Sequence, residues 1–398
     1  MKNLNRNNIL GVDANVKLFS TGIWGKKGFT SVELGIKSST AANLPKDLFA
    51  FMKNVGQSET YNISNLGVRT RNYFELAIGH SHNITERLNI GVKVKLLLGL
   101  VSAQAQIDNM KIQMDRDQWR IDADGSFYAN VPTLEIPTKE GSQELDLQNI
   151  SVFKMENGEA SSPAAILNNL TKGLGYGGAI DLGASYEIID GLTVSAAILD
   201  LGFISWGSSV SGYTSNDPWT FEGFENISVN GGENDQNSIS SQFETMGNDL
   251  LNFVKFYKDD LRSNRLEMLS ATLNLAAEYK LPFYRKLSFG ALYTNRFANA
   301  YSNYEGRVFV NLHPVKWFEL STNYGISNLG SMWGAALSID FPVIGIFLGT
   351  DNLFMDVTPP LEGVGIGLPY KNTNVSVNFG LTFNISKIRR LGDWRDDD

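Results

Sequence analysis

The chain has 398 residues and a net charge of -8; 19% of its residues are charged and 42% are hydrophobic. The acidic balance excludes nucleic acid as a partner, because nucleic-acid binding requires a basic face. The absence of cysteine excludes disulfides, thiolate metal sites and cysteine nucleophiles. No segment approaches the roughly 20 consecutive apolar residues of a membrane helix, whereas the mean hydropathy of -0.15 fits a membrane protein built from strands.

Alternation of apolar and polar residues begins near the N-terminus and recurs along the chain, which predicts an all-β protein. The predicted strands lie near 9–22, 28–38, 70–83, 87–100, 102–112, 117–130, 176–188, 191–205, 267–281, 285–297, 302–313, 316–326, 330–340, 343–353 and 373–386. We expect an antiparallel up-and-down transmembrane β-barrel of about 14–16 strands. It forms a single domain over 1–386, and a polar periplasmic tail follows at 387–398.

The strand signal is clearest in the segment LNIGVKVKLLLGL. Its even-numbered residues from Ile90 to Leu100 are all aliphatic, while Lys93 and Lys95 lie on the other face. The alternation is longer than the about five or six residues of a typical soluble strand and reaches the about nine to eleven of a spanning strand. A lysine facing lipid at mid-bilayer would cost about 2–4 kcal/mol. We therefore predict that both lysines face the lumen.

The segment 267–281 has two distinct faces in the same way. Leu273, Leu275 and Ala277 alternate with the polar residues Asn274 and Glu278. We predict that the latter two also face the lumen. A soluble β-rich adhesin or carbohydrate-binding protein remains the alternative, because a polar strand face can also meet solvent.

The predicted turns and loops alternate along the chain. If the strands run up and down, the tight turns fall at one end of the barrel and the long connections at the other, as in bacterial outer-membrane barrels with short periplasmic turns and long extracellular loops. The strand count is odd and no signal sequence is present. We expect that a signal sequence and one strand precede this chain, unless the count is wrong by one.

Three of the long connections carry helix signals, near 43–54, 162–172 and 243–262. In the first, Asn43 is the predicted N-cap, and Leu48 and Phe51 share an apolar face. In the third, Phe253 and Tyr257 lie on one such face. We expect these helices either to roof their own barrel or to bind a hydrophobic ligand or a partner protein through these four side chains.

The sequence contains no pattern that predicts an enzyme. The GxSxG, HExxH and phosphate-loop motifs are all absent. His80 and His82 would share one strand face, but no third ligand can be named, so no metal site is predicted. We therefore predict neither a catalytic residue nor a cofactor.

Two long runs resemble an uncharacterised FadL-like family of outer-membrane barrels in Bacteroidota: NNILGVDANVKLFSTGIWGKKGFTSVELGIKSSTAANLPKDLFAFMKN and KGLGYGGAIDLGASYEIIDGLTVSAAILDLGFISW. The resemblance implies contact with outer-membrane lipid, and binding or passage of hydrophobic small molecules. It also implies an N-terminal plug, which we expect to precede the first residue. The chain is more distantly similar to PorV- and PorP-like secretion barrels. That likeness implies the alternative of a scaffold partnered with other outer-membrane or periplasmic proteins.

Overall fold

The structure is a computed structural model. It describes residues 6–53, 60–114, 119–131, 136–146, 149, 155–156, 159–160, 174–207, 210–214, 219–221, 255–259, 265–298, 301–351, 356–357, 369–371 and 375–383. Their one helix is α1 (Lys46–Lys53). Within this part of the chain, no helix is long and apolar enough to cross a membrane.

Most of the described chain is strand. In chain order the first strands are β1 (Asn7–Trp24), β2 (Gly28–Pro45), β3 (Thr60–Asn83), β4 (Leu88–Met114), β5 (Trp119–Asn130), β6 (Met155–Glu156), β7 (Glu159–Ala160), β8 (Gly175–Ile189), β9 (Leu192–Trp206), β10 (Val210–Thr214) and β11 (Trp219–Phe221). The later strands are β12 (Phe256–Lys258), β13 (Arg265–Met268), β14 (Thr272–Leu281), β15 (Tyr284–Arg296), β16 (Asn303–Val315), β17 (Phe318–Ser327), β18 (Gly330–Asp340), β19 (Ile344–Asp351), β20 (Asp356–Val357), β21 (Pro369–Lys371) and β22 (Ser376–Phe383).

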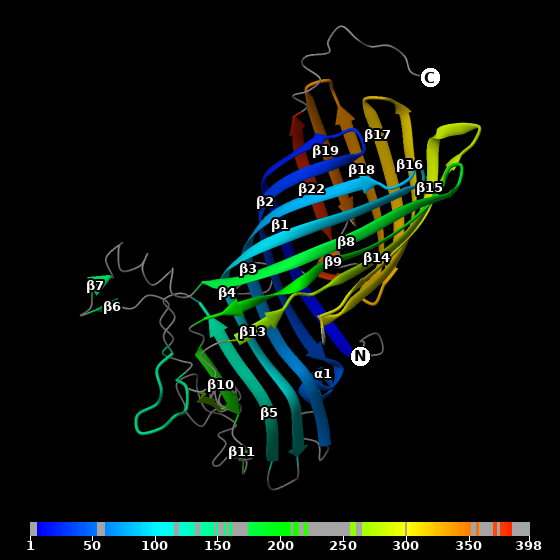
Figure 1. The fold of residues 1–398 in the computed structure, drawn as a ribbon. Coiled ribbons are helices and arrows are strands. Elements are labelled where there is room, and N and C mark those ends of the chain that lie inside the picture. The colour runs from blue at the N-terminus through cyan, green and yellow to red at the C-terminus, as the bar shows by residue number, and fades with distance from the viewer. Residues whose placement is uncertain are drawn as a thin grey trace.

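One antiparallel sheet of 18 described strands forms the body of the protein. Pairing runs from β1 through β2, β3, β4, β8, β9 and β14 to β19, and ends at β22. The sheet curls into a tall barrel (Figure 1). Tight turns join its hairpins, as at Asp190–Gly191, where Gly191 has a φ of 83° that favours glycine. The predicted antiparallel up-and-down β-barrel is confirmed.

The two outermost strands of this path are β1 and β22. Among the described residues no ladder of hydrogen bonds joins them. Every pairing along the path from β1 to β22 is antiparallel, and the path has an even number of steps. The strands β1 and β22 therefore run in the same direction. The expectation that one more strand precedes the chain stays a prediction.

The boundaries of β4 correct one detail of the sequence analysis. The prediction of separate strands near 87–100 and 102–112 is wrong, because β4 is continuous over both. A register shift against Asn72 and Tyr73 of β3 lies where the turn was expected. The shift is a β-bulge, which changes the alternation of side chains without reversing the chain.

Two helix predictions also change. Helix α1 begins at Lys46, and the expected cap Asn43 lies in β2, where its side-chain amide donates to the carbonyl of Asn65. The predicted helix near 243–262 is wrong at Phe256–Lys258, which is strand β12 paired with β10. Strand pairing there prevails over the helical spacing of apolar residues. The rest of that segment and the predicted helix at 162–172 lie outside the described residues, apart from 255 and 259.

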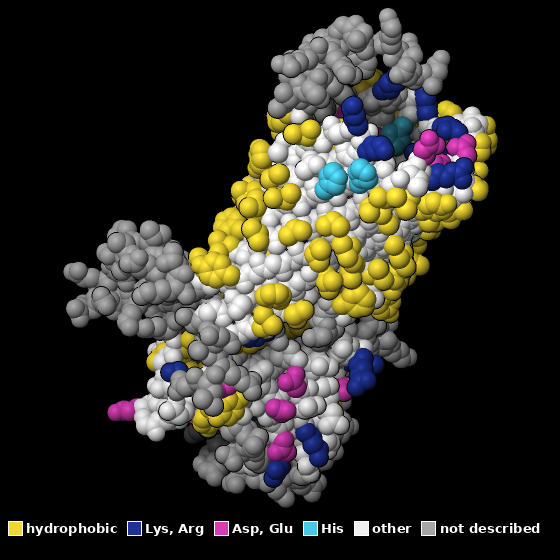
Figure 2. Space-filling view, in the orientation of Figure 1, with side chains coloured by type: hydrophobic (Ala, Val, Ile, Leu, Met, Phe, Trp, Pro, Cys, Tyr) yellow, Lys and Arg dark blue, Asp and Glu magenta, His cyan; other side chains and the backbone are white. Residues whose placement is uncertain are grey.

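Hydrophobic side chains cover the middle of the outer face. Figure 2 shows them between two ends at which charged side chains gather. On β4, Val92 is 44% exposed and Leu96 63% exposed, while Lys95 between them is 4% exposed. Since strand neighbours point to opposite faces, the aliphatic face of β4 is the outer one. An outer face of this kind fits the hydrocarbon of a bilayer.

Beyond this band, β3, β4 and β5 extend past the rest of the sheet, and α1, β10 and β11 lie at the same end (Figure 1). This extension has its own apolar core, formed by Phe51, Tyr61, Ile63, Ile107, Met110, Ile112, Met114, Ile121, Ile136, Leu145 and Phe256. Phe51 of α1 packs against Tyr61 with ring centroids 5.7 Å apart. The helix is therefore fixed to the barrel through its apolar face.

Candidate functional site in the barrel lumen

The inner face of β4 presents lysines to acidic partners on neighbouring strands. The ammonium of Lys95 lies 2.7 Å from a carboxylate oxygen of Asp181 and 2.6 Å from one of Asp200. Lys93 lies 2.6 Å from Glu33 of β2. Both lysines point away from the aliphatic face, as the alternation of β4 requires.

A β-bulge in β9 brings Asp200 to this face. Asp200 has a φ of 56°, in the left-handed region, and its N–H donates to the Asp181 carboxylate at 2.7 Å. The register between β8 and β9 shifts at the same place, between Ile180 and Leu182. One extra residue reverses the alternation, so that Asp200 points inward with Lys95.

These ion pairs are part of a larger inner cluster on β1, β2, β3, β4, β8 and β9. The members, here called the lysine network, are Lys17, Glu33, Lys37, Glu75, Lys93, Lys95, Asp181 and Asp200. Four ammonium groups balance four carboxylates. These ion pairs link six consecutive strands of the sheet, and the network has no net charge.

Asn274 and Glu278 of β14 lie on a polar face that continues onto β15 and β16. The Asn274 side chain accepts a hydrogen bond from Thr294 at 2.8 Å. Glu278 accepts one from Ser288 at 2.6 Å and one from Asn311 at 3.4 Å. Leu275, on the opposite face of β14, is exposed on the outside. The polar groups here bind one another across the strands.

A second charged cluster lies nearer the long-loop end. Arg71 of β3 is 3% exposed, and its guanidinium donates to Glu267 of β13 at 3.1 Å and to the carbonyl of Met268 at 3.1 Å. The same Glu267 accepts from Ser102 and from the Trp206 indole, both at 2.8 Å. None of these residues was predicted from the sequence. The signal for this cluster was the VRTRN segment, where two arginines two residues apart share one strand face.

Two contacts reach across the lumen at this level. Arg296 of β15 forms an ion pair of 2.8 Å with Asp13 of β1, although these strands are not paired with each other. Tyr301, between β15 and β16, holds its ring 4.7 Å from the guanidinium carbon of Arg69 in β3. Groups from strands that are not neighbours in the sheet therefore meet here inside the barrel.

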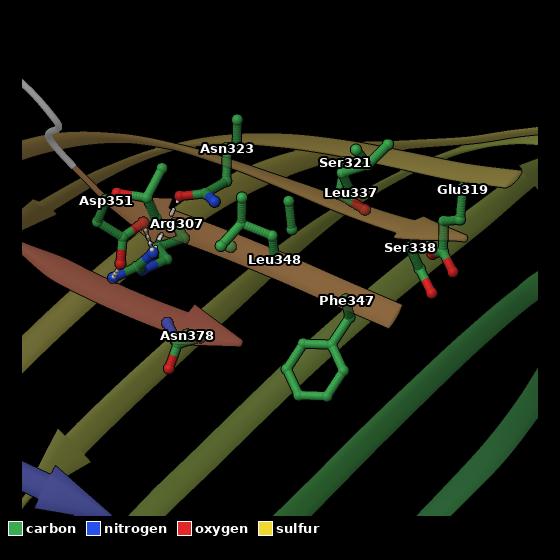
Figure 3. A pocket seen from close by; sticks show the side chains of 14 residues that line it. Arg307, Glu319, Ser321, Asn323, Leu337, Ser338, Phe347, Leu348, Asp351 and Asn378 are labelled. Carbon is green, nitrogen blue, oxygen red and sulfur yellow. Dashed lines mark hydrogen bonds and ion pairs between the residues drawn. The ribbon is translucent and has the colours of Figure 1, made fainter. Parts of the chain in front are cut away.

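A hollow of about 350 Å³ lies on the inner face of β16–β19 and β22. At one side of it, Arg307 donates to Asp351 at 2.9 Å and to Asn323 at 3.0 Å (Figure 3). Phe347 of β19 lines the other side, and its ring lies over Gly380 of β22. A Cβ at Gly380 would overlap that ring, so a larger residue there would require the ring to shift.

The other predicted contact residues are spread over the long-loop end. Leu48 is half-buried and packs against the apolar core of the extension, while Phe51 is 4% exposed within it. Tyr257 lies in β12, and Phe253 lies outside the described residues. Within the described segments these side chains do not form one exposed apolar surface.

The histidine pair lies near the tight turns. His80 bonds Thr30 at 2.9 Å and stacks on His82 with ring centroids 6.0 Å apart. In the described part of the chain, no group of three histidine, cysteine, aspartate or glutamate side chains is placed to hold a metal ion.

Comparison of the chain with models of protein families gives a match. The model of a family of unknown function, DUF5723, matches residues 1–351. No curated protein sequence matches the chain.

Similar solved structures include two toluene transporters and an iron-uptake receptor. TbuX of Ralstonia pickettii shares 7% identity over 87% of this chain and 83% of its own, with a TM-score of 0.38. TodX of Pseudomonas putida shares 9% sequence identity over 88% of this chain and 83% of its own, with a TM-score of 0.39. The ferric-catecholate import receptor Fiu of E. coli K12 shares 8% sequence identity over 87% of this chain and 65% of its own, with a TM-score of 0.28.

Proposed function

The chain belongs to the DUF5723 family of unknown function, and we propose from its geometry that it binds or passes hydrophobic small molecules in the outer membrane. The observation that carries the proposal is the hollow beside Phe347. Its volume of about 350 Å³ falls within the about 300–1,000 Å³ of small-molecule sites. An aromatic ring at one side and fixed polar groups at the other are the usual lining of such sites.

The described residues support a place for the ligand inside the barrel. Phe347 is 41% exposed although it faces inward, so its ring is available for contact. The Arg307 guanidinium is held by Glu305, Asp351 and Asn323, and therefore forms a rigid polar border. The half-buried Leu48 of α1 lies at the long-loop end, where a ligand would arrive from outside.

The test is binding of an apolar fluorophore, 1-N-phenylnaphthylamine, to the protein in lipid nanodiscs. Phe347→Ala should weaken binding about tenfold or more, because the largest apolar contact is lost. Phe379→Ala is the matched control. Its ring lies on the neighbouring strand β22 but points outward and is 79% exposed, so its loss should leave binding unchanged.

Binding to the Phe347→Ala protein with unaltered affinity would refute this location. A further set with polar residues at Leu48, Phe51 and Tyr257 then examines the long-loop end. Unchanged binding in both sets would refute the proposal.

A second candidate function is a scaffold barrel that works with other outer-membrane or periplasmic proteins. The specific observation is the unpaired edges of β1 and β22 in the described sheet. Backbone groups left unpaired in hydrocarbon cost several kcal/mol each. One strand of a partner, antiparallel to both edges, would satisfy them. Purification from native membranes separates the candidates: a stoichiometric co-purifying protein supports the scaffold, and a lone barrel contradicts it.

A further inference from the structure

The arginines of the second charged cluster come from distant segments of the chain. Arg69 and Arg71 share the inner face of β3, Arg265 lies in β13, and Arg296 ends β15. Arg69 lies within electrostatic range of Arg71 and Arg296 as well as of Glu267. Like charges gathered in this way repel one another and are stable only with compensation.

The carboxylates of this cluster compensate it only in part. Among the described residues, Glu267 pairs with Arg71 at 3.1 Å and more distantly with Arg265 at 3.7 Å, and Asp13 pairs with Arg296 at 2.8 Å. Arg69 has no carboxylate partner in the described segments, only the ring of Tyr301. Within the described part of the chain, four guanidinium groups therefore face two carboxylates. The lysine network, by contrast, is balanced.

Donor groups of this cluster also remain unused. The Nε of Arg71 is buried and has no hydrogen-bond acceptor within the described residues, and the buried terminal nitrogen of Arg265 has only the Glu267 oxygen at 3.7 Å, beyond hydrogen-bond distance. Burying a donor without an acceptor is unfavourable, and more so when the donor is charged. Arg71 is almost completely buried, so water does not offset this cost.

We propose that Arg69, Arg71, Arg265 and Arg296 form a binding site for a dianionic group, a dicarboxylate or a phosphate, in the lumen. Two negative charges match the excess of two positive ones, and a guanidinium binds such groups in a bidentate manner. The side chains of Arg265 and Arg296 are 27% and 33% exposed, so the site opens to the lumen. The proposal rests on the arginines alone and does not require the hydrophobic ligand proposed above.

The experiment is isothermal titration of the detergent-purified protein at neutral pH with succinate and inorganic phosphate, and with acetate as the monoanion. Succinate and phosphate should bind at least about tenfold more tightly than acetate. Arg69→Gln should weaken succinate binding about tenfold, because one guanidinium contact to the ligand is lost. Arg69 has no carboxylate partner in the described segments, so the substitution should leave no carboxylate without its partner. Arg69→Lys keeps the charge and should recover part of the loss.

The control variant is Arg120→Gln, whose exposed guanidinium pairs with Asp122 in β5 outside this cluster. It should bind succinate as the unaltered protein does. Equal affinity for acetate and succinate, unaltered succinate binding in Arg69→Gln, or no binding of either dianion would each overturn the proposal. None of these results concerns the apolar fluorophore, so the two proposals fail separately.

Discussion

Lys95 is the residue on which the lysine network depends. Its ammonium bridges Asp181 and Asp200, and it is nearly inaccessible to solvent. A buried ion pair is not in itself a gain in stability, but removing one partner leaves a charge without compensation. Asp200 would keep Lys37 at 3.0 Å, whereas Asp181 would have no cation left in the described network.

Lys95→Met should therefore lower the free energy of unfolding by about 3 kcal/mol. The measurement is urea unfolding of the protein folded into lipid vesicles. Adding Asp181→Asn to the variant should restore part of the loss, because the stranded carboxylate is gone. Arg285→Gln is the control: its pair with Asp190 is exposed on both sides, so its loss should cost under about 1 kcal/mol. Equal effects of the two single substitutions would contradict this account.

Single residues also mark the limit of sequence reasoning. The inward direction of Lys93 and Lys95 follows from period-two alternation alone. The inward direction of Asp200, the partner of Lys95, does not follow from alternation, because a bulge and a left-handed backbone turn it inward, and neither leaves a simple pattern. The link between Arg71 and Glu267 joins residues 196 positions apart, which no local signal reveals.

At the scale of elements, aromatic rings on one strand cover glycines on the next. Trp206 is paired with Gly175, Phe309 with Gly290, and Phe347 with Gly380, all on the inner face. At Gly290 an added Cβ would come 2.1 Å from the Phe309 ring. The ring fills the space that the glycine leaves, so the two positions are one packing unit.

Gly290→Ala should therefore displace the Phe309 ring and destabilise the protein by about 1–3 kcal/mol. Gly306→Ala is the matched control on β16, because a Cβ there meets no atom within 4 Å. Thermal unfolding in detergent, followed by near-ultraviolet circular dichroism, measures both effects. The pairing model is wrong if the two alanines shift the transition equally.

Elements were predictable where one periodicity dominated. The long strands of the barrel follow from alternation and tight turns. Two of them are longer than predicted at the long-loop end: β2 continues to Pro45 and not to about 38, and β3 begins at Thr60 and not near 70. The exceptions have tertiary causes. β4 continues through a bulge because β3 pairs with nearly its whole length, while β8 and then β5 pair with the two halves of its other edge. Tyr257 lies in a strand because β10 pairs with its segment, although its apolar spacing is helical.

At the scale of the whole molecule, one face of the sheet meets hydrocarbon and the other holds the charges. The outer face is aliphatic and exposed, whereas the lysine network and the arginine cluster lie inside. Apolar side chains outside and polar side chains inside are the reverse of a soluble protein, and a membrane barrel requires this arrangement. The prediction from composition and alternation holds at this scale because it needs no knowledge of individual contacts.

The most direct test of the account is a spin-label scan along β4. The chain has no cysteine, so Val92→Cys, Lys93→Cys and Val94→Cys each carry a single label. In lipid vesicles, labels at Val92 and Val94 should collide with oxygen dissolved in the bilayer, and the label at Lys93 with a water-soluble nickel complex. Access of the nickel complex to all three positions would mean that the aliphatic face does not meet lipid, and the membrane barrel would be refuted.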